Sequence, residues 1–316
     1  MWSSHGRDHK LCVWKFSARD EEFLDKTLPV DRKEGESHPS QPWLVYSLSV
    51  NALNFCAFSM AFLDMSSRMD VSRAVLIAVP NALNSGAIDM FHLPLEKRVS
   101  TVPAPMDCQT GMVMAANVFF SLGDLYVCAG YEDGHVVVFV CRGQKLDIEH
   151  GIDPRKWKTV YSSRPHTQPV LGLDVAPSKD RFYASAADAF LGVHPIPSSN
   201  TILDSPLKVI NSGHAGQQGL RVRSDGKVFA TAGWDSRMRV YSCKTMKELA
   251  VLKWHSEGCF AVCFADVEVQ EEQQQAVTKR ELSLATVQQQ RCQKVQNTHW
   301  LVAGSKDGKI SLWDIY

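Results

Sequence analysis

The sequence predicts an all-β fold built from a repeated antiparallel sheet, and three observations support this. One phrase recurs: a small residue, a glycine, a short spacer, an aspartate, a turn residue, and alternating apolar residues that end in an aromatic side chain. The runs after each turn alternate polar and apolar residues, as half-buried strands do. The copies return at intervals close to the length of one repeated β-sheet unit.

Four strong copies keep one spacing. They occupy residues 5–14, 129–139, 232–241 and 303–313, and in each the aspartate precedes the aromatic residue by six positions. Their signature residues are Gly6, Asp8 and Trp14; Gly130, Asp133 and Phe139; Asp235 and Tyr241; and Asp307 and Trp313. Two weaker copies place Asp188 before His194 and Ser85 before Phe91. A spacing kept this often indicates a structural repeat rather than chance.

The intervals between copies match the blades of a β-propeller. The copies end at positions 14, 91, 139, 194, 241 and 313, so the inner intervals are 48, 55 and 47 residues. One blade takes about 40–45 residues, to which a short loop is added. The outer intervals of 77 and 72 residues therefore contain insertions. We expect a solvated polar loop at 19–41. At 266–297 we expect a glutamine-rich, low-complexity protrusion, disordered or partly helical, with a partner-binding helix as the alternative.

Local sequence predicts four short strands in each repeat. The Asp-Gly pairs at 133–134 and 307–308 favour the positive φ angles of two-residue hairpin turns. Expected strands include residues 170–175, 246–252, 259–264 and 309–313. Because four antiparallel strands make one propeller blade, we expect residues 1–316 to form a single propeller domain.

Composition narrows the functional classes. Lys plus Arg and Asp plus Glu each number 34, and this zero net charge argues against non-specific binding of nucleic acid. The start of the chain lacks the apolar core of a signal peptide. The apolar stretch 111–130 contains Gly123 and Asp124 and predicts a turn between two strands. Nine cysteines without a CxxC pair predict reduced, buried thiols. Cys259 and Cys263 are expected on one strand face, packed rather than bound to metal.

Motifs of catalysis or cofactor binding are absent from the sequence. HExxH, GxSxG and GxGxxG do not occur. The segment 304–309 has three residues between its glycines where a P-loop has four, and Ile310 stands where a magnesium-binding hydroxyl is needed. His5 and His9 lie at a turn too poor in further ligands for a metal site. We therefore expect no catalytic residue, cofactor or metal.

Two sets of residues are expected to have structural or solvated roles. Four tryptophans are expected to pack within blades, with exposed partner-binding positions as the alternative: Trp43, Trp157, Trp234 and Trp254. Three cations near turns are expected to be solvated: Arg237, Lys306 and Lys309. No partner-binding residue is predicted.

Several longer phrases carry a family resemblance. They are HGRDHKLCVW at 5–14, QPWLVYSLSVNALNFCAF at 41–58, HAGQQGL at 214–220, KELAVLKWHSEGCFAVCFA at 247–265 and HWLVAGSKDGKISLWDIY at 299–316. In these phrases the chain resembles the fungal ASTRA-associated family of WD40 proteins. More distantly, it is similar to the animal guanine-nucleotide-binding protein beta-subunit-like WD40 proteins. The resemblance covers the chain outside the two insertions.

The resemblance implies a polar chain inside the blades. In WD40 repeats a histidine, a serine or threonine, an aspartate and a tryptophan form linked hydrogen bonds. The residues at such positions are His214, Thr231, Asp235 and Tyr241 in one repeat, and His255, Asp307 and Trp313 in another. A catalytic His–Asp pair is the alternative, but such a pair is expected once, whereas this pairing recurs with the repeat.

The resemblance also implies a propeller of the seven-bladed type, here N-terminally incomplete. Residues 1–8 fall within the second strand of a blade, and six copies are visible, of which the first is partial. A propeller closes by pairing strands from both ends, so we expect the closing strand from upstream residues. We hypothesise an N-terminally shortened form from a mispredicted start, which an in-frame upstream repeat would support.

For function, the resemblance implies a non-catalytic scaffold in the ASTRA complex. That complex is linked to chromatin remodelling and to the assembly of phosphatidylinositol-3-kinase-related kinases. Expected partners are protein subunits of a nuclear complex, and the expected location is the nucleus with a cytoplasmic pool. We expect no small-molecule substrate, membrane partner or direct nucleic-acid contact. A substrate-recognition adaptor, such as that of a ubiquitin ligase, is the alternative, and an enzyme using the propeller channel lacks a supporting motif.

Overall fold

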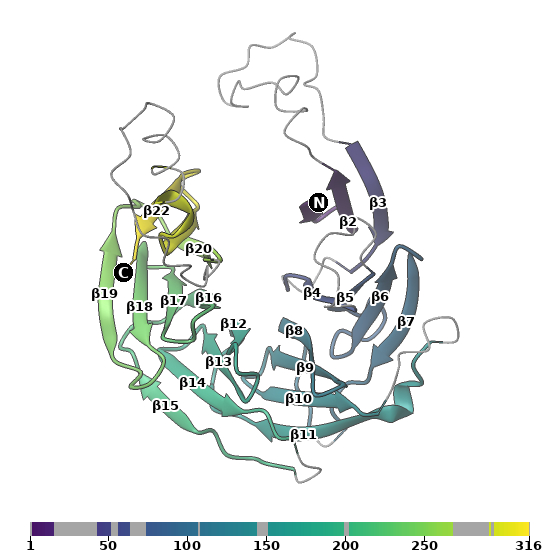
Figure 1. Ribbon diagram of the computed structural model, residues 1–316. Coiled ribbons are helices and arrows are strands. Elements are labelled where there is room, and N and C mark those ends of the chain that lie inside the picture. Colours follow the sequence, from purple (N-terminus) through teal and green to yellow (C-terminus); the bar gives the residue numbers. More distant parts are fainter. Residues whose placement is uncertain are drawn as a thin grey trace, which may run out of the picture. The chain divides into compact units, whose positions relative to one another are not determined.

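The computed structural model describes residues 2–15, 43–51, 56–63, 74–106, 108–143, 151–198, 202–267, 291 and 294–315. Within this part of the chain the strands form six sheets (Figure 1). Each sheet carries one end position of the predicted repeat: Trp14, Phe91, Phe139, His194, Tyr241 and Trp313 lie on β2, β6, β10, β14, β18 and β22. The six predicted repeat units and the all-β class are thereby confirmed.

The chain divides into two compact units. The first comprises Met1–Leu125 and Cys141–Trp157. Its strands are β1 (Trp2–His5), β2 (Lys10–Lys15), β3 (Trp43–Ser49), β4 (Ser59–Phe62), β5 (Val75–Pro80), β6 (Ile88–Leu93), β7 (Lys97–Val102) and β8 (Val113–Ser121). A short 3-10 helix, η3 (Pro154–Lys156), follows later in the chain. The strand orders are β1-β2-β3 and β4-β5-β6-β7.

The second unit comprises Tyr126–Val140 and Lys158–Tyr316. It holds all or most of each remaining strand: β9 (Asp124–Tyr131), β10 (Val136–Cys141), β11 (Trp157–Ser163), β12 (Val170–Val175), β13 (Arg181–Ala186), β14 (Phe190–Pro195), β15 (Lys208–Asn211), β16 (Gln217–Val222), β17 (Val228–Gly233), β18 (Arg237–Ser242), β19 (Glu248–Lys253), β20 (Cys259–Phe264), β21 (Trp300–Ser305) and β22 (Ile310–Asp314). Its sheets have the strand orders β12-β13-β14-β15, β16-β17-β18-β19 and β20-β21-β22, and the sheet of order β11-β10-β9-β8 also includes β8 of the first unit.

The strands predicted from alternation lie where the sequence placed them. β12 and β20 have the predicted bounds, and β19 and β22 differ by one or two residues at their ends. The apolar stretch 111–130 forms β8 and β9 around a turn at Leu122 and Gly123, where φ is 50° and 85°. The described residues supply four strands to four of the sheets and three to the sheets β1–β3 and β20–β22.

One expectation needs correction, and it concerns Cys259 and Cys263. Alternation predicted one shared face, yet Cys259 is buried and Cys263 is exposed. The register of β20 against β21 shifts between Cys259 and Ala261. Such a bulge adds one residue to the strand and reverses the alternation beyond it, so the predicted shared face is wrong.

Cores form where neighbouring sheets pack face to face. In the first unit, Leu11 and Val13 of β2 pack with Ile77 and Val79 of β5. In the second unit, two clusters join successive sheets. One contains Tyr183 and Phe229 of β13 and β17, whose rings lie 4.9 Å apart. The other contains Met238, Val240, Cys259, Val262, Leu301 and Ala303. Burying a large apolar side chain contributes about 1.5–3 kcal/mol, so these clusters hold adjacent sheets together.

The two predicted insertions lie largely outside the described residues. The segment 19–41 lies between β2 and β3 and is outside the described residues. The segment 266–297 lies between β20 and β21, and most of it is also outside them. No helix of the described residues is long and apolar enough to cross a membrane.

Candidate functional site

The last repeat contains a complete polar chain. His255 lies four residues before β20, Asp307 lies in the β21–β22 turn, and Trp313 lies on β22. The Nδ1–H of His255 donates to the Asp307 carboxylate at 3.0 Å. His255 Nε2 lies 2.9 Å from Ser311 Oγ, and the Trp313 indole N–H donates to the same oxygen at 2.9 Å. The Ser311 hydroxyl therefore donates to His255 Nε2. Each polar side-chain atom in this series of hydrogen bonds then has a partner.

The repeat of β12–β15 contains part of the same chain. His166 lies four residues before β12 and places Nδ1 3.0 Å from the carboxylate of Asp188. That carboxylate also accepts the backbone N–H groups of Thr167 and Phe190 at 3.0 Å each. His194 takes the aromatic position, and its Nδ1 lies 2.8 Å from the Tyr161 hydroxyl oxygen. Asp188 and His194 therefore belong to two separate hydrogen-bonded pairs, and the partner of Asp188 is His166, a histidine that sequence reasoning did not assign.

The β12–β15 chain lacks a hydroxyl at its centre. The Nε2 atoms of His166 and His194 are buried and have no hydrogen-bond partner among the described residues. Ala184 of β13 faces Gly192 of β14, at the positions that hold Ala303 and Ser311 in the last repeat. A Cβ added at Gly192 would lie 2.3 Å from His194 Nε2, so the imidazole occupies the space above that glycine.

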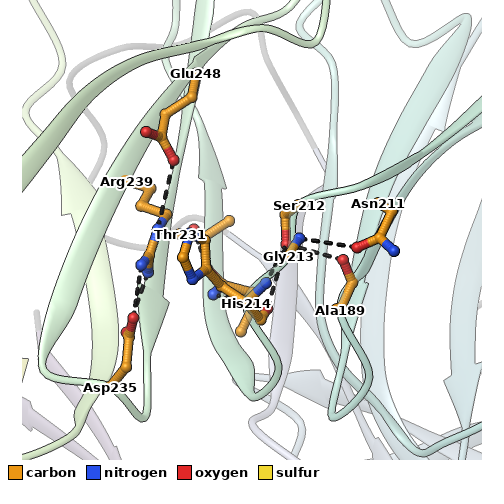
Figure 2. Close-up of polar contacts among 10 residues, drawn as sticks. Ala189, Asn211, Ser212, Gly213, His214, Thr231, Asp235, Arg239 and Glu248 are labelled. Carbon is orange, nitrogen blue, oxygen red and sulfur yellow. Dashed lines mark hydrogen bonds and ion pairs between the residues drawn. The ribbon is translucent and has the colours of Figure 1, made fainter.

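In the β16–β19 repeat the predicted chain is not formed. Asp235 pairs with Arg239, whose guanidinium donates to the carboxylate at 2.6 and 3.1 Å, as Figure 2 shows. Arg239 Nε also lies 3.5 Å from Glu248. Among the described residues, no hydrogen bond joins the His214 ring to Asp235, so the expected His214–Asp235 link is wrong for this repeat.

Loop length explains that difference. His214 lies three residues before β16, whereas His166 and His255 lie four residues before their strands. The backbone of His214 is held instead: its N–H donates to Ser212 Oγ at 3.3 Å, and its carbonyl accepts from Gln217 Nε2 at 3.2 Å. The hydroxyl of Thr231 donates to Gln217 Oε1. Gln217 thus takes the partner role that the sequence gave to histidine, and Tyr241 is buried nearby.

The remaining signature residues have separate contacts. Trp14 donates its indole N–H to Ser4 Oγ at 2.9 Å. A Cβ at Gly6 would lie 2.6 Å from Asp8 Oδ1, and a Cβ at Gly233 would lie 2.6 Å from Asp235 Oδ1. Glycine therefore recurs two residues before these aspartates because the carboxylate folds back over it.

The Asp133 repeat uses local partners. Asp133 holds His135, with Nδ1 2.6 Å from Oδ2, and its backbone carbonyl accepts from Arg164 at 2.9 Å. Gly130 lies against the Val170 side chain, 2.4 Å from an added Cβ, and Phe139 is buried.

Burial and hydrogen bonding set the ionisation of these groups. Burial alone would raise the pKa of Asp307, but hydrogen bonds from His255 and from the backbone of Lys309 and Ser256 outweigh it and lower the pKa to about 2. Burial opposes ionisation of Asp188 in the same way, and its bond to His166 leads the contributions that lower the pKa overall. Burial, with the nearby His166, lowers the pKa of His194 to about 3. The aspartates of these hydrogen-bonded side chains are therefore ionised near neutral pH, and His194 is neutral there.

The sequence contained signals for the partners that were missed. His166 stands at the same distance from its strand as His255, and Ser311 lies two residues before the repeat aromatic. Aligning the repeats on their first strands finds both. No such signal marks Gln217 and Arg239. They take the place of the histidine contacts only in the repeat whose shorter loop leaves the His214 ring without a bond to Asp235. Within the described residues no three histidine, cysteine, aspartate or glutamate side chains lie close enough to hold a metal ion.

Three of the four singled-out tryptophans are exposed, which corrects the expectation that they pack within blades. Trp157 is buried and donates to Ser100 Oγ at 3.0 Å, as expected. Trp43, Trp234 and Trp254 are 78%, 47% and 56% exposed. Each of them lies at or just beyond a strand end, where the turn carries the ring out of the sheet.

Two of these rings border a surface of the second unit. Trp234 lies in the β17–β18 turn, Trp254 follows β19, and Phe260 of β20 is 39% exposed. A Cβ at Gly258 would lie 3.1 Å from the Trp234 carbonyl and 3.4 Å from Phe260 Cζ. Lys309 places its ammonium 5.6 Å from the centre of the Trp254 ring. We call Trp234, Trp254 and Phe260 the aromatic surface, which is the candidate partner-binding site of this unit.

Comparison with known proteins fits the repeat geometry. The family described as "WD domain, G-beta repeat" matches residues 205–242 and 292–314. These segments cover β17 and β18 with their Asp235 turn, and β21 and β22 with their Asp307 turn. The fold and the polar turns therefore define a WD40-repeat propeller protein.

Relatives extend over nearly the whole chain. The chain is 57% identical over 355 residues to ASTRA-associated protein 1 of Aspergillus niger, covering 99% of this chain and 81% of the relative. It is 30% identical over 341 residues to the Schizosaccharomyces pombe protein of the same name, with the same two shares. The chain belongs to the ASTRA-associated protein 1 family. It is also 26% identical over 316 residues to mouse guanine nucleotide-binding protein subunit beta-like protein 1, covering 99% of this chain and 74% of the relative.

Proposed function

We propose that this protein is a non-catalytic scaffold subunit of the ASTRA complex. The observation that carries the proposal is 57% identity over 99% of the chain to a relative named for association with ASTRA. Through that complex, the protein would contribute to chromatin remodelling and to the assembly of phosphatidylinositol-3-kinase-related kinases. The work of such a subunit is to hold protein partners on rigid, repeated sheets.

The chemistry of the repeats supports a structural role for the buried histidines and aspartates. His255 and Asp307 bond to each other and to Ser311, and His166 bonds to Asp188. The same His–Asp pairing therefore occurs in two sheets, whereas a catalytic pair needs one site open to substrate. We infer that these residues hold turns in place and that no substrate, cofactor or metal takes part.

Affinity purification tests the scaffold proposal. The endogenously tagged protein is recovered gently from nuclear extract, and co-purifying chains are identified by mass spectrometry. We expect large kinase-related subunits and their chaperone partners to co-purify, and we expect no nucleic acid to co-purify after nuclease treatment. We also expect the protein to be mainly nuclear, with a smaller cytoplasmic pool. Recovery of cullin-type ligase components in their place would contradict this and favour a substrate-recognition adaptor.

We further propose that the propeller of this protein is seven-bladed. The sheets β1–β3 and β20–β22 have three described strands each, and the matched segment is 81% of the Aspergillus niger relative. The intact mass of the endogenous protein tests the proposal. A mass large enough for a further blade supports it, and a mass equal to the 35.3 kDa of the present sequence contradicts it.

A further inference from the structure

The rings of the aromatic surface are held in fixed positions although they are exposed. The Trp234 indole N–H donates to Gln218 Oε1 at 2.8 Å, and its backbone N–H donates to the Gly216 carbonyl at 3.0 Å. A Cβ at Gly216 would lie 2.4 Å from the indole, so one ring face rests directly on that backbone. A ring fixed before binding loses little conformational freedom when a partner covers it.

Trp254 lies in the loop between β19 and β20, and its ring is also held in place. Its ring meets the His255 imidazole edge-on at a centroid distance of 4.9 Å, and His255 is itself held by Asp307 and Ser311. The loop is tied to the next turn, since Lys306 N donates to the Gly258 carbonyl at 3.0 Å. Rigid, exposed tryptophans are the residues on which binding energy of protein interfaces concentrates.

The charges around these rings are not balanced. Two nearby carboxylates pair with cations, Asp235 with Arg239 at 2.6 Å and Glu257 with Lys306 at 3.7 Å, whereas Asp307 bonds to His255 at 3.0 Å and keeps its negative charge. Lys309 lies over the Trp254 ring, and among the described residues no carboxylate pairs with its ammonium. Lys309 therefore offsets the charge of Asp307, and the balance at this surface depends on the cations beside it.

A like-charge pair gives this surface its positive excess. Arg237 of β18 stands directly opposite Lys253 of β19, and neither pairs with a carboxylate among the described residues. Like charges placed opposite each other on adjacent strands destabilise a sheet. The two lie beside the aromatic surface, since Arg237 is three residues after Trp234 and Lys253 precedes Trp254. An acidic partner would neutralise them, which offsets the cost of keeping them together.

We propose that the aromatic surface binds an acidic peptide segment of a protein partner, with an apolar side chain anchored on the rings and carboxylates placed on Arg237, Lys253 and Lys309. This inference rests on the proposed scaffold function and adds to it the chemistry of the partner. The indoles supply apolar area at the centre, and the cations around them select against neutral and basic segments.

Fluorescence anisotropy on the full chain tests the proposal. The probe is a labelled peptide in which one phenylalanine is flanked on each side by three glutamates. We expect saturable binding that weakens as salt rises, because exposed charges are screened. A probe with glutamine in place of every glutamate is expected to bind about tenfold more weakly or worse. Equal binding of the two probes, or no saturable binding of the acidic one, would overturn the proposal.

Matched variants locate the binding. The double variant Arg237→Glu with Lys253→Glu, and the variant Trp254→Ala, are each expected to lose about tenfold in affinity for the acidic probe or more. Lys247→Glu and Trp43→Ala make the same kinds of change at exposed residues that are not members of the aromatic surface, and we expect affinity within about twofold of the unaltered chain. Circular dichroism confirms that each variant is folded. Equal losses in the controls would contradict the placement, and stronger binding of a single-stranded oligonucleotide of equal charge would assign the surface to nucleic acid instead.

The same double variant separates this proposal from the scaffold proposal. If the unaltered protein recovers the kinase-related subunits and the variant does not, both proposals are supported. If both proteins recover them, these subunits bind elsewhere and the partner proposal fails for them. If neither recovers them while the acidic probe still binds the unaltered chain, the scaffold proposal fails and the surface proposal stands.

Discussion

At the scale of single residues, the repeats show how one hydroxyl completes or breaks a polar chain. In the last repeat the Ser311 hydroxyl joins His255 to Trp313. In the β12–β15 repeat the corresponding space lies between Ala184 and Gly192, and two buried imidazole nitrogens have no hydrogen-bond partner among the described residues. A buried polar atom without a partner costs free energy, so this repeat retains a correctable defect.

We predict that Ala184→Ser stabilises the protein. Ala184 pairs with Gly192, where an added Cβ would lie 2.3 Å from His194 Nε2, so we expect the new hydroxyl beside that nitrogen. One hydrogen bond gained there is worth about 1 kcal/mol of unfolding free energy. Urea denaturation followed by tryptophan fluorescence measures the change. Ala184→Val is the control, because it adds volume without a polar atom. If serine and valine shift the midpoint equally, the effect comes from packing and the hydrogen-bond account is wrong.

We also predict a pH-dependent effect of Asp307→Asn. Hydrogen bonds outweigh burial and lower the pKa of Asp307 to about 2 in the folded protein, below the value of about 3.9 expected in the unfolded chain. The carboxylate therefore stabilises the fold above about pH 4, and this contribution disappears as the pH falls toward 2. The variant should be less stable than the unaltered protein at pH 7, and the gap should close across that range. Asp314→Asn, the same change at an exposed position of β22, serves as the control. A gap independent of pH would contradict the prediction.

These residue-level results show what sequence can and cannot predict. The six-residue spacing from aspartate to aromatic residue predicted Asp307 and Trp313 on one hairpin, because that spacing is set by the turn itself. The role of Gln217 could not be predicted, because it depends on a loop that is one residue shorter than its counterparts. The exposure of Trp234 and Trp254 also depends on which way each turn carries the ring, and the residue types do not record that.

At the scale of elements, the two Asp-Gly turns have the same local geometry and different surroundings. Gly134 and Gly308 both adopt positive φ, at 96° and 75°. A Cβ at Gly308 would meet nothing within 4 Å, whereas one at Gly134 would lie 2.1 Å from the His166 carbonyl oxygen. Sequence predicted both turns, but the close approach at Gly134 comes from the loop before β12, far along the chain.

We therefore predict unequal effects of the same substitution. Gly308→Ala carries only the cost of positive φ, about 1 kcal/mol of unfolding free energy. Gly134→Ala adds a clash with backbone that cannot move aside, and we expect a loss of roughly 3 kcal/mol or more. Thermal unfolding of the two variants under one buffer condition measures the difference. Similar losses would show that the His166 loop yields to the added methyl group.

At the scale of the whole molecule, the reactivity of the cysteine thiols indicates whether the buried cores are intact. The cysteines in the described part of the chain are free, but the expectation that they are buried holds only for Cys56, Cys128, Cys141 and Cys259. Cys56 of the first unit and Cys128 of the second are buried, while Cys263 on β20 is exposed. Burial raises the pKa of the Cys56 thiol to about 12 and also raises the pKa of Cys128. Since the thiolate is the reactive form, burial and ionisation both slow the reaction of the two core cysteines.

We predict that iodoacetamide labels Cys263 before Cys56 and Cys128 in the native protein, and labels the latter two only as their own units open. Peptide mass spectrometry over a urea series reads each site, so Cys56 follows the opening of the first unit and Cys128 that of the second. Cys263→Ser should remove the fast reaction without changing the midpoints of the other two, because an exposed thiol contributes little to the cores. Coincident midpoints for Cys56 and Cys128 would mean that the units unfold together, and separate midpoints that each opens alone. Labelling of either core cysteine as fast as Cys263 without urea would contradict the burial on which this argument depends.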